Sequence, residues 1–75
     1  MTKIKRLSEV KEGKYKVIDI LKPGKLKKLS NIGILIGDII EVIKSGPGPV
    51  IIKNKNTTIG IGYGIAMDII VEKME

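Results

Sequence analysis

The chain has 75 residues, sixteen of them isoleucine, and a formal net charge of +6 at pH 7. It contains no cysteine and no histidine, which excludes disulfides, thiolate metal sites and imidazole-based catalysis. Because a chain of this length buries only about 60% of its unfolded surface, we expect one domain, residues 1–75, with a dense core of β-branched side chains.

The positive charge favours an acidic partner, which is a nucleic acid, an anionic membrane surface or an acidic protein. The lysines are spread along the whole sequence, however, and this pattern is also typical of a solvated surface. No apolar run reaches the roughly 18 residues of a membrane helix. The first six residues are too short and polar for a signal peptide, so we expect a cytoplasmic protein.

The first third of the chain predicts a short turn, a strand and the only helix. We expect the basic residues 1–6 to be frayed and the turn at 7–10 to place Leu7 and Val10 on the core. The β-branched residues of 15–21 predict a strand that stops at the following Pro-Gly pair. A helix is predicted over about 25–32.

Two glycines four positions apart predict a sharp corner after this helix. Gly33 stands where the helix needs a left-handed cap, and Gly37 stands where the chain must turn again before an Ile/Val strand. Backbone geometry explains both glycines, so we interpret them as structural. Leu35 and Ile36 lie between them and add two apolar groups to the corner.

The rest of the chain predicts four more strands, at 38–44, 50–53, 57–60 and 68–73, with a short turn near 61–67. Five short strands with glycine-rich corners favour a small sheet that curls to hide its edges. The predicted fold is therefore mainly β, an SH3-like barrel of about five strands with one short helix after the first strand.

The start of the predicted helix carries an unusual concentration of positive charge. Lys25, Lys27 and Lys28 lie in its first turn, where the helix dipole disfavours each cation by roughly 0.3–1 kcal/mol. A lysine-rich surface that tolerates this cost and a partner-binding face explain the pattern equally well. Together with Leu35 and Ile36, these lysines form our candidate partner-binding residues.

The carboxylates predict neither a catalytic dyad nor a metal site. Asp38 and Glu41 are expected on opposite faces of one strand, so they cannot act as a pair. A ferrous site would need oxygen ligands from residues scattered along the chain, namely Glu9, Glu12, Asp68 or Glu72. Such ligands favour Mg²⁺ or Ca²⁺. We expect no catalytic residue, no cofactor and no tight iron site.

The order of these features resembles a known family. The matching positions run through nearly the whole chain and read Leu7, Gly13, Lys28-Leu29, Ile32-Gly33-Ile34, Gly37, Ile40, Val42, Pro47, Pro49 and Ala66 to Val71. In this order the sequence is similar to the ferrous-iron transport protein A (FeoA) family, which also occurs as an SH3-like domain at the C-terminus of iron-dependent repressors. The family often has Arg in place of Lys28 and Leu in place of Ile32.

The resemblance implies a cytoplasmic, non-enzymatic accessory protein of ferrous-iron uptake. Its implied partner is the membrane ferrous-iron transporter with a cytoplasmic GTPase domain (FeoB-like), on which it docks and which it modulates. At the level of the family, the resemblance also implies transition-metal ion binding. Arg6 is the only arginine available as a finger for GTP hydrolysis. We therefore expect any stimulation to work by ordering loops of the partner.

Two other interpretations remain open. The alternative function is a basic small-barrel module that binds nucleic acid, although Tyr15 and Tyr63 are the only aromatic residues and offer little stacking surface. A free-standing SH3-like domain would instead bind a proline-rich peptide, but the sequence lacks the residues for an aromatic groove.

Overall fold

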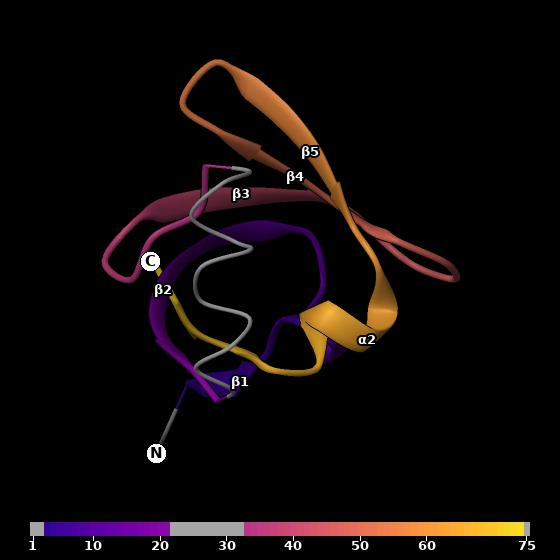
Figure 1. Ribbon diagram of the computed structural model, residues 1–75. Coiled ribbons are helices and arrows are strands. Elements are labelled where there is room, and N and C mark those ends of the chain that lie inside the picture. Colours follow the sequence, from indigo (N-terminus) through magenta and orange to yellow (C-terminus); the bar gives the residue numbers. More distant parts are fainter. Residues whose placement is uncertain (1–2, 22–32, 75) are drawn as a thin grey trace.

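The computed structural model describes residues 3–21 and 33–74, and in this part of the chain six strands form one antiparallel sheet. The sheet has the order β1-β6-β2-β3-β4-β5 and curls around the interior (Figure 1). Its strands are β1 (Ile4–Arg6), β2 (Gly13–Ile20), β3 (Ile39–Ser45), β4 (Val50–Asn54), β5 (Thr57–Ile61) and β6 (Ile69–Lys73). The mainly β, SH3-like fold class predicted from the sequence is confirmed.

The core is built mostly from β-branched side chains on the inner face of the curled sheet. The largest fully buried side chains are Leu7, Ile34, Ile40, Ile52, Ile61, Ile69, Val17, Val42, Val50 and Val71. Each buried isoleucine or valine contributes about 1.5–3 kcal/mol relative to an exposed position. The isoleucine-rich composition therefore compensates for the absence of phenylalanine and tryptophan.

Two β-bulges help the sheet to curl. In β2 the register with β6 shifts between Val17 and Asp19, so that Ile18 is the extra residue. The second shift lies between Val42 and Lys44 of β3, where Ile43 is extra and exposed. A bulge bends its strand and increases the local twist, which brings distant strands around the same core.

Two short helical segments close one end of the barrel. The 3₁₀ segment η1 (Leu7–Glu9) buries Leu7, and the following Val10 is also buried, as the sequence predicts. The helix α2 (Tyr63–Ala66) forms at the turn expected near 61–67 and contacts η1. Its buried residue is Ala66.

The expectation that residues 1–6 are frayed is wrong for 4–6. These residues form β1, which pairs with β6 in the register Ile4↔Glu72, Lys5↔Val71 and Arg6↔Ile70. All three side chains of β1 are exposed. The strand is recognised by its backbone pairing with β6, and hydrophobic periodicity gives no signal for such pairing. This strand is the reason for six strands where about five were expected.

The ends of the other predicted strands agree with the structure to within about two residues. One of these small differences changes the place of Asp38. This residue precedes β3 and so does not share a strand with Glu41, contrary to the expectation. The helix predicted over about 25–32 lies outside the described residues. Within 3–21 and 33–74, no helix has both the length and the apolar character needed to cross a bilayer.

Candidate functional site

The candidate site is the 33–38 corner, the loop that leads into β3. Gly33 and Gly37 have positive φ values of 96° and 101°. A side chain at either position would meet nothing within 4 Å, so the backbone conformation and not lack of space requires glycine. The two glycines thus set the path of the loop, and the residues between them are displayed according to that path.

The corner separates one buried apolar residue from two exposed ones. Ile34 is fully buried in the core, whereas Leu35 and Ile36 are 50% and 49% exposed. Ile39, the first residue of β3, is also among the exposed large hydrophobic residues. Three large apolar side chains within five positions therefore face outward. Exposed apolar side chains on a loop held by a rigid scaffold are typical of a protein interface.

Asp38 fixes the turn that presents these side chains. Its backbone N–H donates to the Leu35 carbonyl at 3.1 Å, and its Oδ2 accepts from the Leu35 N–H at 3.0 Å. Both polar groups of the Leu35 backbone are thus bonded to one residue. The exposed side chain of Leu35 consequently extends from a turn in which both the N–H and the carbonyl of its backbone are hydrogen-bonded to Asp38.

Asn54, at the end of β4, attaches the corner to the β4–β5 hairpin. Its side-chain amide donates to the Gly33 carbonyl at 2.6 Å and to Asp38 Oδ2 at 3.0 Å. Asn54 is one of two buried polar residues among those described. The sequence gives only a weak signal for this role, because asparagine is common wherever strands end.

A second set of contacts ties the corner to the centre of the sheet. The Gly37 N–H donates to the Val17 carbonyl at 2.7 Å, and the Val17 N–H donates to the Asp38 carbonyl at 2.9 Å. Val17 is fully buried in β2. The corner is therefore anchored to the core strand on one side and to the hairpin on the other. Beside it lies a hollow of about 340 Å³, to which Lys55 and Thr57 also contribute.

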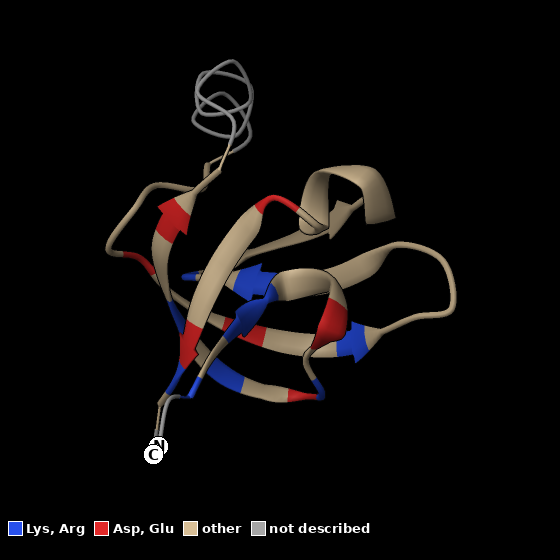
Figure 2. Ribbon diagram, turned by 90° about the horizontal axis from the view of Figure 1, so that it is seen from below, with Lys and Arg blue, Asp and Glu red and all other residues tan. Residues whose placement is uncertain are grey.

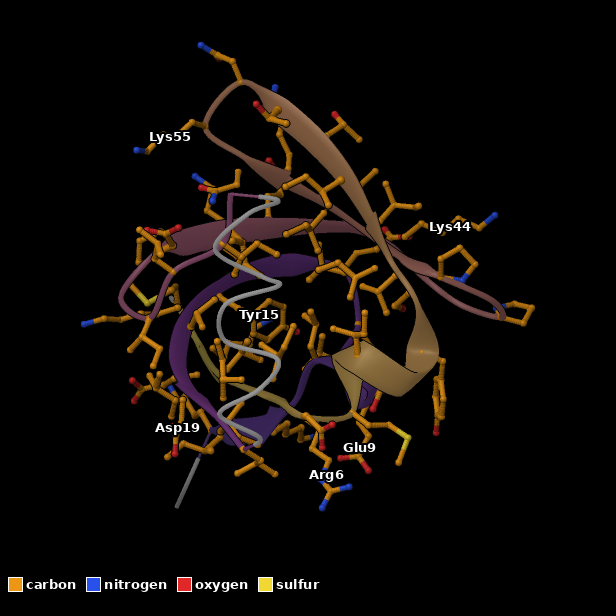
Figure 3. All side chains as sticks on the ribbon, in the orientation of Figure 1. Arg6, Glu9, Tyr15, Asp19, Lys44 and Lys55 are labelled. Atoms are coloured by element: carbon orange, nitrogen blue, oxygen red, sulfur yellow. The ribbon has the colours of Figure 1, made fainter. Side chains whose placement is uncertain are left out.

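The remaining candidate residues, Lys25, Lys27 and Lys28, lie outside the described residues. In the described chain, basic and acidic residues are both scattered over the sheet (Figure 2). Figure 3 shows Lys44 and Lys55 extending outward from the β3–β4–β5 side of the barrel. Of the candidate set, Leu35 and Ile36 are exposed in the same loop as the two glycines.

The carboxylates of the described residues do not converge. No group of three or more Asp or Glu side chains in 3–21 and 33–74 is arranged to hold a metal ion. Glu9 lies in η1 and Glu72 in β6, each exposed, while Asp68 is buried between α2 and β6. The geometry that stands out in this part of the chain is therefore the supported apolar corner.

The curled antiparallel sheet and its short helical segments define a small SH3-like barrel protein. A family model described as the FeoA domain matches residues 5–73, and the chain belongs to this family. The family resemblance inferred from the sequence is thereby confirmed.

Individual relatives agree with this assignment. The chain is 39% identical over 71 residues to a protein of Methanocaldococcus jannaschii provisionally named Fe(2+) transport protein A, covering 92% of this chain and 87% of the relative. The crystal structure of an iron uptake regulatory protein (FeoA) superposes with a TM-score of 0.85 and 36% identity, covering 95% of this chain and 97% of the other.

A likeness in fold extends to a larger regulator. The manganese regulator SloR matches with a TM-score of 0.84 at 20% identity, over 92% of this chain and 34% of the regulator. This likeness concerns the fold alone. The expectation named iron-dependent repressors, whereas this neighbour is described as a manganese regulator.

Proposed function

We propose that this protein is a cytoplasmic accessory factor of ferrous-iron uptake. In this proposal it docks on the cytoplasmic GTPase region of the membrane ferrous-iron transporter and modulates the transporter without performing chemistry itself. Membership of the FeoA family supports a role in ferrous-iron transport. The name of the Methanocaldococcus jannaschii relative and the FeoA crystal structure support the same role.

The observation that carries the proposal is the supported apolar corner. Leu35 and Ile36 are half exposed, although burial of each would contribute about 1.5–3 kcal/mol. The hydrogen bonds from Asn54 and Asp38 hold the loop in this arrangement. A preorganised loop loses little conformational entropy on binding, so its exposed apolar groups are well suited to a partner.

Capture by the transporter's cytoplasmic domain tests the docking corner. We expect the double substitution Leu35→Ser with Ile36→Ser to weaken capture at least about tenfold, since truncation of central apolar contacts commonly costs more than 1 kcal/mol each. The matched control is Ile43→Ser with Tyr63→Ser, which removes two exposed apolar groups from β3 and α2. Equal capture of both variants and the unmodified protein would exclude this corner.

Charge reversal tests the lysines predicted to accompany the corner. Replacement of Lys25, Lys27 and Lys28 by Glu is expected to weaken the same capture, and Lys44→Glu is the control for a loss of positive charge elsewhere. Unchanged capture by the triple variant would remove these lysines from the docking face.

The proposed modulation does not depend on an arginine finger. Arg6 is the only arginine of the sequence. It lies in β1, where its backbone is paired with Ile70 of β6. An arginine finger is worth about 10³–10⁵ in turnover, so its loss is easily measured. We expect the Arg6→Ala protein to keep its effect on GTP hydrolysis by the transporter domain within a few-fold. Complete loss of stimulation in a folded Arg6→Ala protein would contradict ordering of the partner's loops as the mechanism.

The alternative of nucleic-acid binding gains little from the structure. Tyr15 is buried, which leaves Tyr63 as the exposed aromatic residue of the described chain. One exposed ring does not form a stacking platform. Gel retardation with DNA and RNA at rising salt is the check on this alternative, because association through charge alone fades as salt increases.

A further inference from the structure

A second hollow, separate from the 33–38 corner, is lined mainly by lysines. It has a volume of about 440 Å³. Four lysines contribute to it, Lys3, Lys5, Lys11 and Lys73, together with Glu9. Val10 and Tyr15 complete its lining. We call it the basic pocket. It shares no lining residue with the hollow beside the corner.

The basic pocket is assembled from segments far apart in the sequence. Lys5 lies in β1, Lys73 ends β6, and Lys11 precedes β2. The Lys73 N–H donates to the Lys3 carbonyl at 3.1 Å, which joins the N-terminal segment to the end of β6. Folding therefore places these four lysines around one hollow, although they are dispersed along the chain.

Tyr15 organises the floor of the basic pocket. Its ring is only 4% exposed, and its hydroxyl donates to the Lys11 carbonyl at 2.9 Å. The Lys73 ammonium lies 5.3 Å from the centre of the same ring, a cation–π distance. Gly13 leaves room for this arrangement, since a Cβ there would lie 3.2 Å from Lys73 Nζ. Two of the four lysine segments are thus positioned by one buried side chain.

The charges of the basic pocket are unbalanced. Among the described residues, four lysines and one glutamate, Glu9, line it. Like charges around a concave surface raise the local potential and attract anions. The aliphatic stems of the lysines, with Val10 and Tyr15, also give the hollow an apolar lining. The surface is therefore complementary to a ligand that combines negative charge with an apolar group.

We propose that the basic pocket binds an acidic peptide segment of a partner protein, with carboxylates around a central apolar side chain. This inference goes beyond the proposed docking corner and does not depend on it. A nucleic acid fits less well, because the Tyr15 ring is buried and cannot stack on a base. No arginine is among the described residues that line the pocket, so bidentate contacts to phosphate or to a base edge are missing.

The test uses the full chain and synthetic peptides. The probe is a fluorescent Glu-Glu-Phe-Glu-Glu peptide, and the control peptide has Gln in place of each Glu. We expect the acidic peptide to bind more tightly than its neutral counterpart. In the ¹⁵N-labelled protein, it should shift the amide signals of Tyr15 and Lys73 before those of Leu35 and Ile36. Shifts confined to other surfaces would overturn the assignment.

Matched variants separate the basic pocket from the general positive charge. The variant Lys5→Gln with Lys11→Gln removes two charges from the pocket and leaves the Tyr15–Lys73 contact intact. The control is Lys44→Gln with Lys55→Gln, which removes two exposed lysines that extend away from Tyr15 (Figure 3). We expect about tenfold weaker peptide binding for the pocket variant and at most about twofold weaker binding for the control. Charges that contact the ligand contribute more to affinity than charges at the edge of an interface or beyond it.

Three further outcomes of these measurements would each change the assignment or leave it standing for a stated reason. Equal weakening in both variants, or no preference for the acidic peptide, would show that only net charge acts. Tighter binding of a single-stranded oligonucleotide through the same residues would replace the peptide assignment by a nucleic-acid one. Because the probe contains no transporter domain, failure here leaves the proposed docking of the corner untouched, and failure of capture leaves the peptide result standing.

Discussion

Asn54 is the residue on which the geometry of the corner most depends. One buried amide group donates to the Gly33 carbonyl and to the Asp38 carboxylate. No other side-chain donor from the β4–β5 hairpin to these two acceptors is seen in residues 33–74. Loss of this amide would remove both hydrogen bonds, which are part-buried, and Asp38 Oδ2 would keep only its bond from the Leu35 N–H.

We predict that Asn54→Ala lowers the free energy of unfolding by about 1–3 kcal/mol, because the two hydrogen bonds of a buried amide are lost. Urea denaturation of the purified chain measures the change. Asn56→Ala is the matched control, because Asn56 is exposed in the β4–β5 turn and should change stability by less than about 0.5 kcal/mol. A loss at Asn54 no larger than at Asn56 would contradict the proposed support of the corner.

The same residue shows what the sequence could not predict. The spacing of Gly33 and Gly37 predicts a corner, because a backbone with positive φ favours glycine and this preference can be read from the local sequence. The contact from Asn54 to Gly33 joins residues 21 positions apart, and local pattern carries no information about such pairing. The basic pocket was missed for the same reason, because its lysines meet only when β1, β2 and β6 pair.

At the scale of elements, the outer face of the sheet carries a row of alternating charge. Glu41 of β3 lies opposite Lys14 of β2 on one side and opposite Lys53 of β4 on the other. All three residues are exposed. Directly opposite pairs of unlike charge favour the observed strand register, and like charges there oppose it.

The row predicts the effect of a single charge reversal. Glu41→Lys places three cations side by side and should lower the free energy of unfolding by about 1 kcal/mol, since cross-strand pairs contribute about 0.2–1 kcal/mol each. Added salt should reduce this loss through screening. Glu41→Gln, which keeps the shape, should lose less. Denaturation at two salt concentrations makes the comparison, and a salt-independent loss would show that charge is not the cause.

Elements differ in how well the sequence predicts them. β2, β3, β4 and β6 have apolar patterns and were predicted to within about two residues. β1 has only exposed side chains and was missed. Its pairing with β6 satisfies backbone groups at one edge of the sheet and buries little side-chain surface. Such a strand can be assigned only from the structure, where its partner strand is known.

At the scale of the whole molecule, the isoleucine-rich core lets a short chain support two distinct surfaces. The fold class followed from composition and turn spacing, because β-branched residues and frequent glycines restrict a chain of this size to a curled sheet. The candidate site was predictable only in part. Leu35 and Ile36 could be assigned to a corner, whereas their support by Asn54 and Asp38 required the tertiary structure.

The most direct test of the account maps the contact surface itself. The ¹⁵N-labelled protein is titrated with the unlabelled cytoplasmic domain of the ferrous-iron transporter, and backbone amide signals are followed by nuclear magnetic resonance. We predict that the signals of residues 33–38 shift or broaden first, while those of Ile43 and Tyr63 remain in place. Perturbation confined to surfaces away from the corner, or none at all, would contradict docking through it.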